Sequence, residues 1–243
     1  VFMKKILVCF VGTGTYLEFL PQYYEKVMEN FCPGHPKDIL VLTDGELSDT
    51  PEHIILRETE HKAWPYITLE RFNIILKHRD VIEKYDWFVF MDADTIVNQR
   101  VEYDEFFDES KDYLGVHHPC HYLGWPPHNQ KYGSFDRTNS RARVGDDDDL
   151  STYWQGCLWG GKVPEIFAIM EELDSRTQLD LKDDIIALWH DESHLNKIFI
   201  ENKDKVRTLP SDYAYPECFD DRVKDQLEPK IVHLAKNNSK YHS

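Results

Sequence analysis

The stretch Asp86-Trp-Phe-Val-Phe-Met-Asp-Ala-Asp-Thr-Ile-Val97 decides the fold. Its run of aromatic and β-branched residues at positions 88–91 predicts a buried strand. Asp92 and Asp94 follow that run one residue apart, and side chains at i and i+2 leave an extended chain on the same face. Two like charges held this close need a counter-charge, and a divalent cation shared with the phosphates of a ligand would supply it. A solvated turn after an edge strand is the alternative interpretation.

The segments around this strand alternate between strand-like and helix-like patterns. We expect strands over residues 4–11, 38–42, 51–56 and 153–159. Helices are expected over residues 68–83, 163–173 and 183–199, together with one that begins at residue 16 or 21 and ends at residue 30. This alternation predicts an α/β fold with a mostly parallel central sheet, in which ligands bind beyond the carboxyl ends of the strands.

Composition narrows the classes of function. The net charge of −16 argues against a nucleic-acid partner, because phosphate backbones are bound by clustered Lys and Arg. The sequence holds no apolar run near the roughly 20 residues that span a bilayer. Five cysteines without CxxC spacing fit neither a disulfide framework nor a zinc site, which favours a reducing, cytoplasmic location. The 243 residues are expected to form a single domain.

Residues 117–149 differ in character from the rest of the chain. They are rich in Gly, Pro, His, Asn and Arg, and they end in four consecutive aspartates at positions 146–149. A segment this long inside a compact domain is usually a binding loop or a mobile lid. The aspartate run is interpreted as a solvated loop in preference to a cation site.

A second notable stretch is Trp189-His-Asp-Glu-Ser-His-Leu-Asn-Lys197. Its histidines at i and i+4 are spaced as in a zinc-binding helix, but Asp191 stands where the metalloprotease pattern requires Glu. Two other interpretations remain. Asp191 is the N-cap of a helix, or Asp191 and Glu192 form an acidic pair that faces a ligand.

The small residues of Gly12-Thr-Gly-Thr15 follow the first expected strand. They lack both the GxGxxG spacing and the Walker lysine, so a dinucleotide or P-loop site is weakly supported. The same segment suits a wall against which a base ring packs.

Several of these stretches together resemble the family 6 retaining glycosyltransferases, the group of the ABO blood-group transferases and α-1,3-galactosyltransferase. The resemblance is carried by residues 189–197, 64–72, 90–94, 118–119 and 153–161, in the family's order. It implies a GT-A fold with a Rossmann-like sheet. It also implies transfer of galactose or N-acetylgalactosamine from a UDP-sugar to an oligosaccharide acceptor in an α-1,3 linkage, assisted by Mn²⁺ or Mg²⁺. We expect this protein to lack the membrane anchor of the animal enzymes, as the bacterial and viral members of the family do.

The resemblance also implies roles for individual residues. Glu192 is expected to be the catalytic carboxylate, and Asp92 and Asp94 are expected to hold the metal. The donor-binding set is expected to comprise Val11, Gly12, Thr13, Tyr16, Arg71, Asp92, Ala93, Asp94, Gln155, Gly156, Cys157, Asp191 and Lys236. The acceptor-binding set is expected to comprise His118, Trp189 and Glu192.

Within the donor-binding set, residues 11–13 and Tyr16 are expected to hold the uridine. Gln155 and Cys157 occupy the positions that select the donor sugar. Lys236 is expected to meet the diphosphate when the C-terminal tail closes. The resemblance divides the domain into a donor-binding part over about residues 1–100, an acceptor-binding part over about 101–230 and a mobile tail over 231–243.

Two other classes of function compete with this interpretation. A metal-dependent phosphohydrolase or nucleotidyltransferase also uses paired aspartates after a strand, but it needs further metal ligands and leaves residues 189–197 unexplained. A non-catalytic sugar-binding relative would keep the fold, whereas Asp92, Asp94 and Glu192 are all intact. The sequence does not indicate an oligomeric state.

Overall fold

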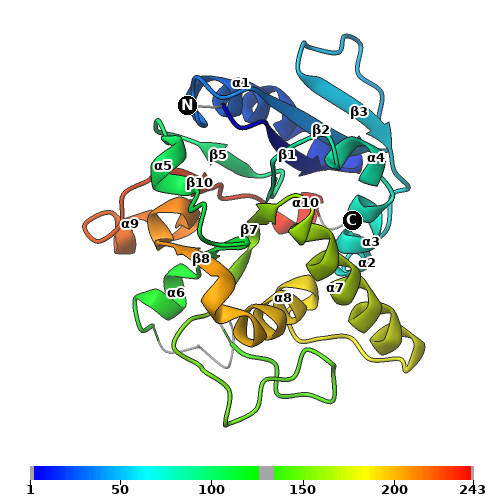
Figure 1. Cartoon of the computed structure of the whole chain (residues 1–243), viewed down its shortest axis with the longest axis vertical. Coiled ribbons are helices and arrows are strands. Elements are labelled where there is room, and N and C mark those ends of the chain that lie inside the picture. Colours follow the sequence, from blue (N-terminus) through cyan, green and yellow to red (C-terminus); the bar gives the residue numbers. More distant parts are fainter. Residues whose placement is uncertain (1–2, 126–133, 242–243) are drawn as a thin grey trace.

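The computed structural model describes residues 3–125 and 134–241 and contains two β-sheets with helices packed around them (Figure 1). Within these residues the larger sheet has seven strands, in the order β3 (Ile54–Glu58), β2 (Lys37–Thr43), β1 (Ile6–Val11), β4 (Trp87–Met91), β7 (Trp154–Lys162), β6 (Tyr113–His117) and β8 (Val206–Leu209). The smaller sheet, in the same described part, has the order β5 (Thr95–Val97), β10 (Ile231–His233) and β9 (Tyr215–Pro216).

The directions of the strands confirm the expected mostly parallel sheet. β3, β2, β1 and β4 run parallel to their neighbours, and β6 runs parallel to β8. β7 is antiparallel to both β4 and β6. The carboxyl ends of β1 and β4 therefore lie side by side at one edge, which is where ligands bind in open α/β sheets.

Helices cover both faces of the larger sheet. In the described residues they are α1 (Leu20–Asn30), α2 (Tyr66–Leu69), α3 (Arg71–Leu76), α4 (Arg79–Ile82), α5 (Tyr103–Phe106), α6 (Pro119–Tyr122), α7 (Glu165–Lys182), α8 (His190–Glu201), α9 (Asp220–Val223) and α10 (Asn238–Tyr241). None of them combines the length and the apolar character needed to cross a membrane.

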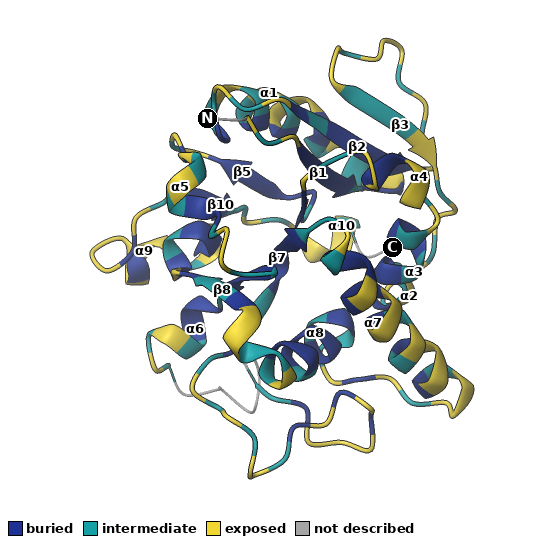
Figure 2. Cartoon of the chain, viewed as in Figure 1, coloured by how far each residue is buried: buried dark blue, intermediate teal, exposed yellow. Residues whose placement is uncertain are grey.

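The side chains of β1 alternate between two cores. Val8 and Phe10 pack on the face that α1 covers, whereas Leu7 and Cys9 pack on the face that α3, α7 and α8 cover. Figure 2 shows the central strands of the larger sheet mostly buried and the edge strand β3 intermediate to exposed, with exposed residues on α7. A sheet buried on both faces explains the continuous apolar runs of the sequence.

Three expected helices differ from the structure. The helix expected over 163–173 is α7, which continues to Lys182. The helix expected over 68–83 is divided into α2, α3 and α4, because Glu70 (φ −95°, ψ 15°) and His78 (φ −111°, ψ 30°) leave helical geometry. The helix expected over 183–199 begins only at His190, because Asp184 adopts a φ of 57° just after α7. The spacing of apolar residues continues across these breaks and does not reveal them.

The strand expected to end at residue 159 continues through the paired glycines to Lys162. At Gly160 a Cβ atom would lie 2.2 Å from the carbonyl oxygen of Phe88 in β4. Glycine is therefore required here by the close approach of two backbones, and it does not mark the end of the strand.

The expected binding loop over residues 117–149 contains the short helix α6, and its residues 126–133 lie outside the described part of the chain. Asp136 accepts the backbone N–H of Leu188 at 2.7 Å, which ties the loop to the segment before α8. In the aspartate run, Asp148 pairs with Lys197 of α8 at 2.9 Å, so this loop is anchored to the domain. Whether it acts as a lid stays a prediction.

Gly160→Ala should destabilise the fold by about 3 kcal/mol, because the added methyl group must push β4 and β7 apart. Urea unfolding followed by tryptophan fluorescence measures the loss. Gly145→Ala is the matched control, since its Cβ would approach no atom closer than 3.5 Å. Equal unfolding midpoints for the two variants would contradict the role given to Gly160.

Candidate functional site

Three adjoining cavities lie beyond the carboxyl ends of β1 and β4. The first, of about 130 Å³, is lined by Val11, Thr13, Tyr16, His61, Lys62, Trp64, Ile67, Thr68, Arg71, Asp92, Ala93, Asp94, Lys236 and Tyr241. The second, of about 160 Å³, is lined by Trp64, Thr68, Arg71, Asp92, Gln155, Gly156, Cys157, Trp189, His190, Asp191, Glu192 and His233. The third, of about 270 Å³, is lined by His118, Pro119, Cys120, Gln155, Pro216, Cys218, Phe219, His233, Leu234, Ala235, Lys236 and Asn238. Because the cavities share lining residues, one ligand can extend from one to the next.

The carboxylates Asp92 and Asp94 lie in the turn between β4 and β5. The backbone N–H of Asp92 donates to the carbonyl of Cys157 in β7 at 2.8 Å, and the Asp92 carbonyl accepts the Thr95 hydroxyl at 2.7 Å. Asp94 is buried, whereas the side chain of Asp92 is about one-quarter exposed. The apolar strand therefore carries both carboxylates to the mouth of the first cavity, as its sequence predicts.

Two basic side chains meet Asp94. Lys236 forms an ion pair with it, and Nε2 of His233 lies 3.2 Å from its carboxylate. Burial alone would raise the pKa of Asp94, but His233 and Lys236 outweigh burial and hold this pKa well below its ordinary value. Asp94 therefore stays ionised at neutral pH.

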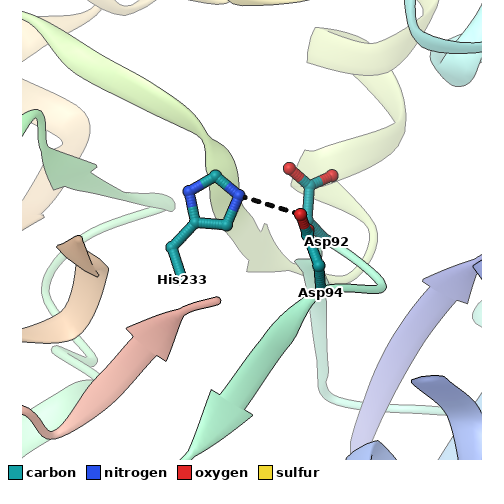
Figure 3. Close-up of side chains that lie close together, drawn as sticks. All are labelled: Asp92, Asp94 and His233. Carbon is teal, nitrogen blue, oxygen red and sulfur yellow. Dashed lines mark ion pairs between the residues drawn. The ribbon is translucent and has the colours of Figure 1, made fainter. Parts of the chain in front are cut away.

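The residues around Asp94 fit a divalent cation. Among the residues that the structure describes, Asp92, Asp94 and His233 form the one group of His, Cys, Asp or Glu with ligand atoms all within 4.8 Å of one another (Figure 3). Carboxylate oxygens suit Mn²⁺ and Mg²⁺, and an imidazole is compatible with Mn²⁺. Our sequence analysis missed His233, because no local motif marks a histidine in the C-terminal segment as a neighbour of Asp94.

The zinc hypothesis for His190 and His194 is not supported by their positions. His194 is fully buried, and its Nε2 lies 3.5 Å from Asp180 of α7. The ring of His190 packs edge-on against Trp64, with 5.0 Å between the ring centroids. The two rings therefore belong to separate environments.

Arg71 connects the two acidic stretches. Its guanidinium is buried, donates to Asp191 at 2.6 Å and lies 3.1 Å from Asp92. It also lies over the ring of Phe90, 4.4 Å from the ring centroid. One planar cation with several N–H groups can serve both carboxylates at once.

Asp191 does not cap α8, so the capping hypothesis was wrong. The N-cap position is held by Trp189, and Asp191 lies in the first turn with its carboxylate on Arg71. His190 begins the helix with a φ of 52°, a left-handed conformation that is uncommon for a residue other than glycine. This backbone turns the acidic pair inward toward the second cavity.

Glu192 is held by two hydrogen bonds in the second cavity. The hydroxyl of Tyr153 donates to its Oε1 at 2.7 Å, and the backbone N–H of Gly156 donates to its Oε2 at 2.8 Å. A Cβ atom at position 156 would lie 3.1 Å from the Cβ of Glu192, so the glycine allows β7 to approach this carboxylate.

Burial raises the pKa of both members of the acidic pair. The pKa of Glu192 is raised to about 7, chiefly by burial and against the hydrogen bonds from Gly156 and Tyr153. The pKa of Asp191 is raised to about 6, again chiefly by burial and against the attraction of Arg71. A carboxylate poised near neutrality in a cavity is a candidate for chemistry.

The other donor-binding residues expected from the sequence meet mostly in the first two cavities. Val11, Thr13 and Tyr16 face the first cavity, where Nζ of Lys236 lies 4.9 Å from the centroid of the Tyr16 ring. Gly12 is buried behind them and bonds to Leu42 of β2 through its backbone at 3.0 Å. The fold thus brings together residues that are distant in the sequence and that the resemblance assigns to donor binding.

The expected acceptor residues line different cavities. Trp189 and Glu192 line the second cavity, whereas His118 lines the third. The His118 side chain is buried and accepts the backbone N–H of Cys120 at 3.2 Å, and burial lowers its pKa to about 3. His118 is therefore a neutral side chain.

The C-terminal segment is packed onto the domain. Its lysines have partners in the absence of a ligand: Lys236 pairs with Asp94, and Lys240 pairs with Glu18 at 2.6 Å. The Tyr241 ring lies 5.1 Å from the ring of Tyr16. The structure describes the segment up to residue 241, and its mobility stays a prediction.

Glu192→Gln should change how stability depends on pH. The pKa of Glu192 in the folded protein, about 7, exceeds the ordinary value of 4.5, so between these values the folded protein binds more protons than the unfolded chain. Stability of the unmodified protein therefore falls as pH rises through this window and levels off above it. Glutamine does not ionise, so the variant should gain up to about 3 kcal/mol relative to the unmodified protein between pH 4.5 and 8.

Urea unfolding at several pH values measures this difference in the free energy of unfolding. The pH dependence is the informative quantity, because a lost hydrogen bond to Tyr153 or Gly156 shifts all values equally. A difference that stays constant from pH 4.5 to 8 would show that burial does not perturb Glu192.

Comparison with known proteins links this geometry to one family. A model of glycosyltransferase family 6 matches residues 4–242. The O-antigen biosynthesis glycosyltransferase WbnI of Escherichia coli is 26% identical over 98% of this chain and 97% of its own length. The human globoside alpha-1,3-N-acetylgalactosaminyltransferase 1 is 24% identical over 92% of this chain, and rat histo-blood group ABO system transferase 1 is 24% identical over 83%. The matches span 63% and 58% of these two animal relatives.

Proposed function

The chain belongs to glycosyltransferase family 6, and on this premise we propose that it moves galactose or N-acetylgalactosamine from a UDP-sugar to an acceptor glycan. The new bond is of the α-1,3 type, and the anomeric configuration of the donor is retained. The observation that carries the proposal is the half-buried Glu192 carboxylate in the cavity that Asp92 and Gln155 also line.

The first cavity suits the nucleotide part of the donor. Val11, Thr13 and Tyr16 supply a wall of backbone and ring for uridine, and Lys236 and the Asp92–Asp94 turn border the position for a diphosphate. Bound Mn²⁺ or Mg²⁺, held by Asp92 and Asp94, would neutralise the charge that develops on the leaving diphosphate. Without a cation these carboxylates would repel the diphosphate.

The second cavity suits the donor sugar and the reacting carbon. Cys157 is buried at its wall, and Gln155 lines both this cavity and the third one, which supports the role of this pair in selecting the sugar. The Arg71–Asp191 pair presents fixed polar groups for sugar hydroxyls. His118 lines the third cavity and Trp189 lines the second, which supports an acceptor that lies across the boundary between these cavities.

Glu192 acts on the positive charge that develops at the anomeric carbon. An ionised Glu192 stabilises this charge or attacks the carbon to form a covalent glycosyl intermediate. Tyr153 and Gly156 fix the direction of its two oxygens, so little reorganisation is needed as charge develops. Retention follows from the covalent route, in which the acceptor then displaces Glu192. It also follows when Glu192 only stabilises the charge and the acceptor attacks from the face that UDP leaves.

We also propose a division of the domain by ligand. Donor-binding residues come mainly from about positions 1–100, and acceptor-binding residues come mainly from about 101–230. The segment from 231 onward would close over the donor, and Lys236 and Tyr241 on the wall of the first cavity support this role.

UDP binding should depend on a divalent cation, because two carboxylates and a diphosphate repel one another without one. Calorimetry measures the affinity for UDP in the presence of Mn²⁺ and then in the presence of a chelator. The affinity should be at least about tenfold lower with the chelator. The double variant Asp92→Asn/Asp94→Asn should reproduce the effect of the chelator. Asp147→Asn, at an exposed position, is the matched control and should bind UDP as the unmodified protein does. Equal affinity with and without metal would remove the metal role of Asp92 and Asp94.

Glu192→Gln should lower turnover by about two orders of magnitude or more while UDP affinity stays nearly unchanged, because the charge acts in the transition state. Turnover is measured as hydrolysis of a panel of UDP-sugars, which also identifies the donor. Glu83→Gln, exposed and on α4's carboxyl end, controls for the loss of a carboxylate elsewhere. Near-normal turnover in a folded Glu192→Gln protein would refute the catalytic assignment.

A further inference from the structure

The pairing of β10 with β5 brings His233 to the acidic turn. β10 runs antiparallel to β5, with His233 opposite Thr95, and the backbone N–H of Leu234 donates to the Asp94 carbonyl at 2.9 Å. Figure 3 shows the His233 ring directed from its strand toward the two carboxylates. Main-chain hydrogen bonds thus place this imidazole beside Asp94 independently of any ligand.

The two ring nitrogens of His233 have different neighbours. Nε2 lies 3.2 Å from Asp94, and Nδ1 lies 3.4 Å from Nε2 of Gln155. In this arrangement the amide donates to Nδ1, so the ring proton is on Nε2 and points to the carboxylate.

Gln155 can reverse this arrangement. Its Oε1 is buried and has no hydrogen-bond partner among the described residues. A half-turn of the amide exchanges Oε1 and Nε2, so that Oε1 accepts a proton from Nδ1 and the orphaned oxygen gains its partner. Nε2 of His233 then carries a lone pair that faces Asp92 and Asp94. Histidine ligands of metals are usually held in this way, by an oxygen that accepts the other ring N–H.

We infer that His233 is a third protein ligand of the cation at Asp92 and Asp94, and that Gln155 is the positioning residue that orients its ring. The inference rests on the proposed function, which supplies the cation. Gln155 then serves the metal site in addition to its expected role in selecting the sugar.

A nitrogen ligand changes which cation the site favours. Two carboxylates alone offer only oxygen and suit Mg²⁺ as well as Mn²⁺, whereas an imidazole adds affinity for Mn²⁺ over Mg²⁺. The neutral ring adds no negative charge. The charges of the two carboxylates and of the divalent cation therefore still cancel beside the diphosphate.

Lys236 pairs with Asp94, which is also one of the inferred ligands of the metal. Its ion pair with Asp94 supplies the counter-charge in the structure described here. Arrival of a divalent cation would release Lys236 from Asp94, and the first cavity, which Lys236 also lines, is where a diphosphate is proposed to bind. His233 is held by its strand and stays with the carboxylates.

The direct test is pulsed electron paramagnetic resonance of Mn²⁺ bound to the full chain in the presence of UDP. We expect a nitrogen hyperfine coupling from imidazole in the unmodified protein and its loss in His233→Asn. Absence of this coupling in the unmodified protein overturns the inference, whatever the variants do. The coupling does not depend on turnover or on small changes in stability.

Affinity measurements test both residues. His233→Asn and Gln155→Met should weaken Mn²⁺ binding with UDP present by 10- to 100-fold, the usual range for residues that hold a metal ligand in place. His233→Asn should weaken Mg²⁺ binding less than Mn²⁺ binding. Gln155→Glu should retain the affinity for Mn²⁺, because its carboxylate always accepts the proton from Nδ1. Equal losses in Gln155→Met and Gln155→Glu would exclude the orienting role of Gln155.

His53→Asn is the matched control for His233→Asn. His53 lies just before β3, outside the three cavities, and its φ of 70° is a conformation that asparagine tolerates. This variant should bind Mn²⁺ normally.

The double variant of Asp92 and Asp94 separates the two proposals. If it loses Mn²⁺ while His233→Asn keeps full affinity and no nitrogen coupling is seen, the metal site stands and the third ligand is refuted. If it keeps Mn²⁺, the metal part of the proposed function fails first.

Discussion

The buried guanidinium of Arg71 is the constraint on which the rest of the site depends. It joins α3 to the turn after β4 through Asp92 and to the first turn of α8 through Asp191. Removing one member of a buried ion pair leaves an uncompensated charge and costs about 3–5 kcal/mol. Lysine cannot replace Arg71, because one ammonium lacks the planar array of N–H groups that serves two carboxylates in different directions. The distance between the turn after β4 and the first turn of α8 is thus fixed by the Arg71 side chain.

The site keeps its carboxylates in different states by giving them different surroundings. Asp94 is buried but faces His233 and Lys236, and its pKa is held low. Glu192 is half-buried and faces neutral donors, the Tyr153 hydroxyl and the Gly156 N–H, and its pKa is raised to about 7. Hydrogen bonds from neutral groups offset burial less than full charges do, which explains the contrast. In the proposed function, the ionised Asp94 binds the cation and Glu192 acts at the reacting carbon.

Local sequence patterns predicted what depends on neighbouring residues in the chain. The aromatic run before Asp92 indicated a buried strand and a carboxylate pair at its end, and residues 189–197 indicated Glu192 through family resemblance. The patterns could not show the break at Glu70, because apolar spacing continues past it. His233 was missed for a different reason: it reaches Asp94 only through the pairing of β10 with β5, which the order of residues does not encode locally. The turn of the backbone at His190 was likewise hidden, since histidine gives no hint of a left-handed φ.

The pairing of β10 with β5 in the smaller sheet determines when His233 and Lys236 can reach the acidic turn during synthesis. β5 leaves the ribosome soon after the acidic turn, but its partner β10 is made only after β8. The large sheet, by contrast, is complete once β8 has emerged. A nascent chain that ends before residue 231 therefore holds all seven strands of the larger sheet, and its two aspartates have neither Lys236 nor His233 beside them. Domains fold as they are made, so the larger sheet forms before His233 and Lys236 join the two aspartates.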